Sequence, residues 1–168
     1  MKSTPSLHCQ KSQVHLLNHS KAMKNSNLHK HLNTLLATEA AFGLQLRNAH
    51  WNLISPQFKP LHEYLGELYS ASNERIDEIA ERNRMIGGIP IASFTEFEAY
   101  SLITPASKPM KHSEEIFKTL LSSTQTIMKH LKKGIDMAAK ADDPGTEDFL
   151  TAMLQDHEKN AWFLASHT

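Results

Sequence analysis

Four side chains between positions 50 and 81 have the types and spacing of metal ligands. Asp77 and Glu81 lie four residues apart, so on a helix they share one face and can hold a single cation between them. His62 lies fifteen residues before Asp77 on the same expected helix, which places it about 22 Å away at roughly 1.5 Å per residue. A metal–ligand bond is only about 2 Å long. His62 therefore cannot join the carboxylates of its own chain, but it could do so if a second subunit ran its helix antiparallel across a twofold axis.

His50 supplies a second imidazole from a different helix. It falls within an apolar stripe, where a lone histidine is more often a hydrogen-bonded core residue. Asp77 and Glu81 could likewise be an ordinary solvated face, because they lie about 120–160° from the centre of their helix's apolar stripe. Two imidazoles and two carboxylates together suit Fe(II), Mn(II) or Zn(II), and they argue against a soft-metal thiolate site.

Two long amphipathic helices must position these ligands. Apolar residues recur with a 3.6-residue period from Leu28 to Leu53, and Ser55-Pro56 ends this pattern. A second helix is expected from about Phe58 to Ile86, where Gly87-Gly88 stops it. A third is expected from near residue 113 to about residue 141. The fourth follows a Thr146 cap and runs to about residue 166.

A long connection separates the second and third helices. Within it, residues 93–102 have the pattern of a short helix, with Ser93 as its cap and Glu96 in a capping-box position. There is almost no strand pattern. These features predict an all-α fold, a ferritin-like four-helix bundle with a short extra helix between helices two and three.

The chain divides by composition into a basic arm and a bundle. Residues 1–26 are rich in Ser, Asn, His and Lys and predict a flexible arm, while residues 27–168 form the bundle domain. The first 38 residues hold five of the 18 basic residues and no acid, which leaves 13 basic and 18 acidic residues and a net charge of −5. Such asymmetry points to a polyanionic partner, although a short polar tail also needs charge to stay soluble.

The remaining composition limits the class of protein. No apolar run is long enough to cross a membrane, and the first residues lack the apolar core of a signal peptide. Cys9 is the only cysteine, so no internal disulfide forms. We therefore expect a cytoplasmic protein, with no membrane partner.

Acidic residues cluster where the fourth helix begins. Around a threefold axis they would form a funnel that concentrates Fe(II), whereas capping of the helix explains only part of the cluster. The candidate pore residues are Asp142, Asp143, Glu147 and Asp148.

At its longest motifs the chain resembles the Dps proteins (DNA-binding proteins from starved cells), the mini-ferritins. The resemblance covers roughly residues 27–166. The motifs that carry it are NAHWN at 48–52, PQFKPLHEYLGELY at 56–69, IDEIAER at 76–82, GG at 87–88 and DHEKNAWFL at 156–164.

This resemblance implies a ferroxidase centre shared between subunits. His50 and His62 of one subunit would meet Asp77 and Glu81 of a twofold mate, and Trp51 would trap stray radicals. The protein would be a hollow, twelve-subunit shell that oxidises Fe(II), preferentially with hydrogen peroxide, and stores ferric mineral. It would thereby protect the cell and its DNA from oxidative damage. It would be nucleoid-associated if it binds DNA.

The chain also departs from the family pattern. Many members carry a second carboxylate at the position of Gly66, and its absence weakens a second iron position. No Glu-x-x-His motif is present, so the chain lacks the di-iron site that larger ferritins hold in the bundle core.

Two other functions compete with the iron-oxidising shell. One is a nucleoid protein that binds DNA without sequence preference through the arm, with iron chemistry secondary. Its candidate contacts are Lys2, Lys11, Lys21 and Lys24. The other is a structural bundle with a vestigial site, which the complete set of four ligands disfavours.

Overall fold

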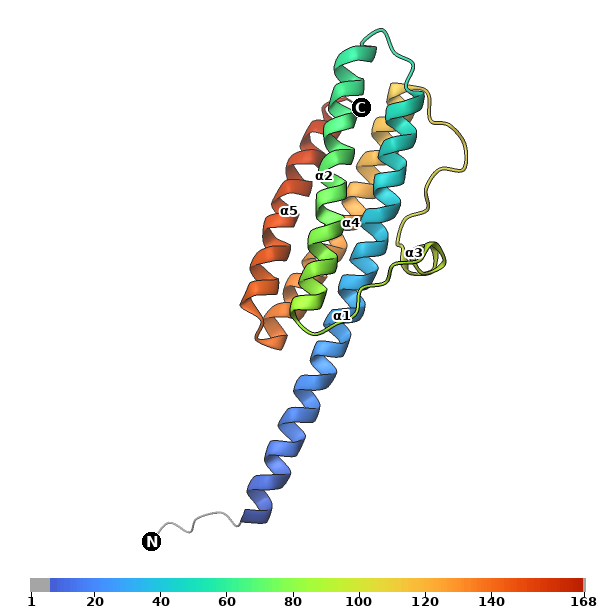
Figure 1. Ribbon diagram of the computed structural model, residues 1–168. Helices are drawn as coiled ribbons and strands as arrows, with labels where there is room; N and C mark the ends of the chain where they lie inside the picture. The colour runs from blue at the N-terminus through green and yellow to red at the C-terminus, as the bar shows by residue number, and fades with distance from the viewer. Residues whose placement is uncertain (1–6, 168) are drawn as a thin grey trace.

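The chain forms an all-α bundle in which four long helices lie alongside one another (Figure 1). The computed structural model describes residues 7–167, and side chains from residue 26 onward. The helices are α1 (Leu7–Asn52), α2 (Phe58–Met85), α3 (Phe94–Tyr100), α4 (Ser113–Ala141) and α5 (Pro144–Ala165). The predicted fold is confirmed, including the short extra helix, which is α3.

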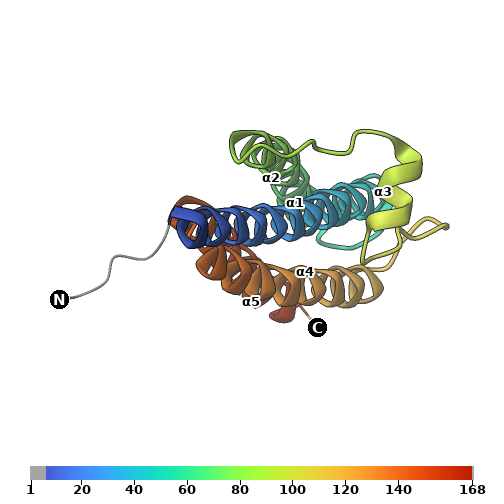
Figure 2. The same cartoon turned by 90° about the horizontal axis from the view of Figure 1, so that it is seen from below.

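α1 is the central element of the packing. It contacts α2, α3 and α4, and α4 in turn packs against α5. Seen along the bundle, α1 lies between α2 on one side and α4 on the other (Figure 2). The predicted apolar stripes of α1 and α2 form the core, whose fully buried members include Leu32, Leu35, Leu46, Leu65 and Ile79.

α1 begins at Leu7, well before the periodic apolar pattern that starts at Leu28. No proline or glycine lies between residues 6 and 42 to interrupt a helix. The early part of α1 projects beyond the end of the bundle (Figure 1). The division into an arm of residues 1–26 and a bundle of residues 27–168 stays a prediction.

Local capping fixes the ends of the shorter elements. The Ser93 hydroxyl accepts a hydrogen bond from the Glu96 backbone amide at 3.3 Å, as the capping box predicted. The prediction that Thr146 caps α5 is wrong, because Asp143 is the cap and Thr146 is its third residue. Pro144 occupies the first position of α5, where its fixed φ suits a helix start and its missing N–H removes no hydrogen bond.

In the part of the chain that the structure describes, none of the helices is long and apolar enough to cross a membrane.

A stacked histidine pair joins α1 to α4. The rings of His31 and His130 lie 3.6 Å apart with 9° between their planes. Each ring donates through Nε2 to the other residue's backbone carbonyl, at 3.0 and 3.1 Å. Gly134 makes this approach possible, because a Cβ there would lie 2.7 Å from His31 Nε2.

Burial and the neighbouring ring lower the pKa of His31 to about 4. Burial also lowers the pKa of His130, with Lys133 adding to the effect. Below pH 6.5, the ordinary histidine pKa, these two histidines become protonated in the unfolded chain but stay neutral in the folded chain until the pH is lower. The stabilising contribution of this pair is complete above pH 6.5 and is lost as the pH falls towards 4.

We predict that acidification destabilises the bundle through this pair. Each unit of pKa difference corresponds to about 1.4 kcal/mol, which is roughly 3–6 °C in melting temperature for a chain of this size. Between pH 7 and pH 5, the melting temperature of metal-free His31→Gln should fall by several degrees less than that of the wild type. The exposed His112, changed to Gln, is the matched control and should follow the wild type. Parallel pH profiles for all three proteins would contradict the prediction.

Candidate metal centre

Two of the predicted ligands, His50 and His62, meet within one chain. Their rings stack with centroids 3.7 Å apart and 20° between the planes. His50 Nδ1 donates to the His62 carbonyl at 2.8 Å, and His62 Nδ1 donates to the His50 carbonyl at 3.0 Å. Because both Nδ1 atoms carry the proton, both Nε2 lone pairs are left to bind a metal.

The surroundings of this pair are aromatic and cationic. Phe58 stacks on His62 at 4.9 Å between centroids, and Tyr69 meets His50 edge-on at 5.1 Å. The guanidinium of Arg47 lies 5.3 Å from the centre of the Tyr69 ring. Trp51 is 70% exposed although it is adjacent to His50.

The two predicted carboxylates point away from their own chain. Asp77 and Glu81 are both exposed on α2. Among residues whose side chains are described, no three His, Cys, Asp or Glu side chains gather closely enough to hold a metal ion. The structure therefore brings the two histidines together and leaves the two carboxylates apart from them.

Beside Glu81 lies a cavity of about 460 Å³ between α2 and α5. Its charged lining consists of Arg75, Glu78, Glu81, Arg82 and Asp156.

Comparison with known proteins identifies the family. The chain matches the family model of the ferritin-like domain over residues 29–168. DNA protection during starvation protein 2 of Bacillus anthracis is 37% identical over 133 residues, covering 79% of this chain and 90% of that protein. The DNA protection during starvation protein of Brevibacillus brevis is 34% identical, covering 79% and 89%. The crystal structure of a Dps protein from Bacillus brevis superposes with a TM-score of 0.82 at 31% identity, covering 86% and 96%. This chain belongs to the Dps family of the ferritin-like superfamily.

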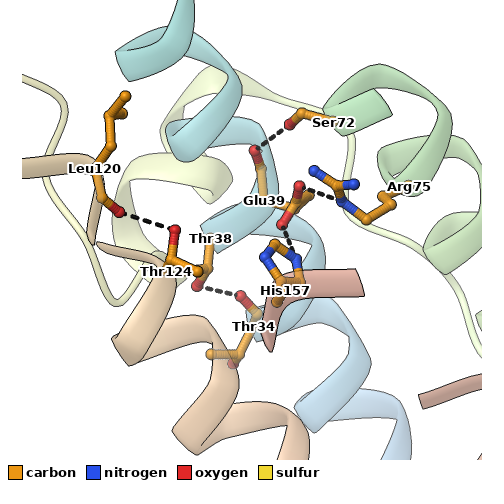
Figure 3. A network of polar contacts seen from close by, with 8 residues as sticks. All are labelled: Thr34, Thr38, Glu39, Ser72, Arg75, Leu120, Thr124 and His157. Carbon is orange, nitrogen blue, oxygen red and sulfur yellow. Dashed lines mark hydrogen bonds and ion pairs between the residues drawn. The ribbon is translucent and has the colours of Figure 1, made fainter. Parts of the chain in front are cut away.

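The core of this Dps chain holds a charged cluster that sequence reasoning missed (Figure 3). Glu39 of α1, Arg75 of α2 and His157 of α5 are all buried. Arg75 Nε donates to Glu39 Oε1 at 2.8 Å, and His157 Nε2 lies at an ion-pair distance of 3.3 Å from Glu39 Oε2. The Ser72 hydroxyl also donates to the Glu39 backbone carbonyl at 3.3 Å. A charged residue inside the apolar stripe of α1 was the available signal.

Opposing effects set the pKa of Glu39. Burial raises it, but the His157 ring and the Arg75 guanidinium outweigh burial and lower the pKa to about 2. The stabilising contribution of the carboxylate is therefore complete above its ordinary pKa of 4.5 and is lost as the pH falls towards 2.

The four acids predicted for a pore do not have equal roles. Asp143 caps α5 and pairs with Arg82 at 2.9 Å. Arg82 also donates to the Thr146 hydroxyl at 2.8 Å. Asp142 is exposed in the left-handed conformation that ends α4, with φ of 58°. The charge of Asp143 is thus largely compensated, and a funnel would depend on the other three acids.

We predict that Glu39→Gln destabilises the bundle strongly. It would leave Arg75, whose side chain is 7% exposed, without an anionic partner, and breaking a buried pair in this way costs about 3–5 kcal/mol. Thermal and denaturant unfolding at fixed protein concentration measure the loss. Glu114→Gln, which removes an exposed carboxylate paired with Lys118, is the matched control and should change little. Equal effects of the two substitutions would show that the buried cluster is not a source of stability.

Proposed function

We propose that this Dps chain assembles into a shell, expected to have twelve subunits, that oxidises Fe(II) and stores the ferric product. Each site would take His50 and His62 from one subunit and Asp77 and Glu81 from a twofold mate. The paired histidines carry this proposal, because their backbone hydrogen bonds fix both rings with Nε2 left free. The proposed setting is the cytoplasm.

The reach of a metal–ligand bond requires the second subunit. Asp77 and His62 are about 22 Å apart along α2, and no described cluster in one chain contains three ligands. An antiparallel α2 from a mate would bring its own Asp77 and Glu81 to the histidine pair. The same symmetry creates a second, identical site.

An exposed apolar face supports a second copy as the partner. Leu44 is 50% exposed and Phe94 is 88% exposed. They border a groove of about 490 Å³ formed by α1, α2, α3 and the segment after α3. Ile76, the residue before Asp77, also lines this groove. A mate that covers the groove would therefore lie beside the Asp77 face of α2.

The residues suit ferrous oxidation. Neutral imidazoles bind Fe(II) through Nε2, and the two carboxylates favour the more highly charged Fe(III) product. In the overall stoichiometry, each hydrogen peroxide would take one electron from each of two ferrous ions, its O–O bond would break, and two protons would complete two waters. Trp51 is oxidisable, exposed and adjacent to His50, and in this proposal it would intercept a stray radical. Asp142, Glu147 and Asp148 would attract Fe(II) to the shell.

We predict that the site can be rebuilt from two defective subunits. His50→Ala/His62→Ala and Asp77→Asn/Glu81→Gln should each lose rapid peroxide-driven iron oxidation. The carboxylate variant should still assemble, because its substituted side chains are exposed. Refolded mixtures of the two should regain a substantial part of the activity, as absorbance of ferric product measures. If the mixed assemblies are no more active than either variant alone, the proposal of a site shared between subunits is wrong.

DNA binding through the N-terminal segment is a second candidate function. Its support is the run of 38 residues with five lysines and no acid, together with the projection of α1 beyond the bundle (Figure 1). The candidate lysines at positions 2, 11, 21 and 24 lie outside the described side chains. Many copies on one shell would raise avidity without new contacts.

We predict weak, sequence-independent DNA binding that falls steeply with salt, because each phosphate contact displaces counterions. Binding should strengthen below about pH 6.5, where His8, His15 and His19 gain charge. A gel shift comparing the full chain with one that begins at Asn25 measures this effect. Equal retardation by both, or none by the full chain at low salt and low pH, would remove the segment from DNA binding.

A further inference from the structure

We propose that each shared site binds one ferrous ion, and that Gly66 sets this limit. The inference rests on the proposed function and concerns the groups that this chain places around its own histidines.

The neighbours of His62 along α2 offer no anionic ligand. Four residues before it stands Phe58, whose ring stacks on the imidazole. Four residues after it stands Gly66, and Tyr69 follows at the next turn on the same side. No carboxylate among the described side chains joins the two histidines as a third ligand. Within the described part of the chain, the proposed site therefore takes its anionic ligands from the mate, as Asp77 and Glu81.

The charge of these ligands matches one divalent ion. Both imidazoles are neutral when Nδ1 donates to a carbonyl and Nε2 binds a metal. Asp77 and Glu81 contribute two negative charges, which neutralise a single Fe(II). A second Fe(II) would leave two positive charges uncompensated. Arg47, stacked on the Tyr69 ring that touches His50, adds a further cation nearby.

Gly66 lies beside the histidine pair, where one more carboxylate would add the ligand that a second ferrous ion needs. A Cβ at residue 66 would be 3.3 Å from His50 Cε1 and 3.6 Å from His50 Nδ1. The same Cβ would be 3.9 Å from Tyr69 Cε1. An acidic side chain would therefore start directly beside the histidine pair, so a single residue decides whether the site carries a third negative charge.

Calorimetric titration with Fe(II) under anaerobic conditions counts the ions without any oxidation. The Asp77→Asn/Glu81→Gln variant gives the background from metal bound elsewhere, including the acids at the start of α5. We expect the wild type to bind one more ion per chain than this variant. A difference of two would overturn the inference and leave the shared site intact. No difference would overturn the shared site itself.

Gly66→Asp should raise the difference from one ion to two per chain. Gly66→Asn is the matched control, because it has the same size without the charge, and it should stay at one. A count that remains at one in an assembled Gly66→Asp shell would overturn the role of Gly66.

A second position on the same helix keeps the test decisive if crowding against His50 prevents assembly of Gly66→Asp. Phe58 is 47% exposed and flanks His62 on the other side. Phe58→Glu supplies a carboxylate there, and Phe58→Gln is its neutral control. We expect two ions for the first and one for the second. Equal counts would show that a missing carboxylate does not set the limit.

Discussion

One buried carboxylate fixes the orientation of the helix that carries most of the proposed ligands. Glu39 binds Arg75 of α2 and His157 of α5, so three helices meet on one side chain. Residues two positions apart on a helix are separated by about 200°. Because Arg75 faces the core, Asp77 must face away from it. The outward direction of the carboxylates follows from a contact made inside the bundle.

The buried Glu39 cluster is distinct from the proposed metal site. The core holds a buried set in which Arg75 and His157 pair with Glu39. The proposed metal site lies nearer the surface, where α1 and α2 bring His50 and His62 together. In that proposal the fixed rise of α2 divides the ligands between subunits, since no bending within a continuous helix brings His62 to Asp77. The orientation of α2 about its axis therefore decides both which residues enter the core and which carboxylates face outward.

Periodicity predicted most of the fold because it depends on side chains that pack within the same chain. The bounds of α2 and α4 and the Ser93 cap followed from local patterns and agree with the structure. The start of α1 did not, because an apolar stripe reports burial and says little about a helical segment that projects beyond the bundle (Figure 1). The cap of α5 was placed three residues late, since Asp143 and Thr146 are both good caps and the Arg82 contact that accompanies Asp143 comes from another helix. The pairing of Glu39 with Arg75 and His157 depends on tertiary packing, and no sequence spacing encodes it.

The sequence predicted the two histidine ligands, His50 and His62, but not the geometry of their rings. Residue types and spacing predicted four ligands, but the ring stacking and the reciprocal hydrogen bonds depend on how α1 packs against α2. Those contacts orient both rings before a metal or a mate arrives, which removes part of the ordering entropy from binding. In the proposed arrangement, metal and mate then support each other. A ligand that binds only the assembled state stabilises it by about 2.7 kcal/mol at a hundred times its dissociation constant. Twofold symmetry gives two such sites, so the metal would strengthen the interface by about twice that amount. An interface that already covers the apolar groove beside Ile76 would need no metal to form, and ferrous ion would tighten a contact that packing has established.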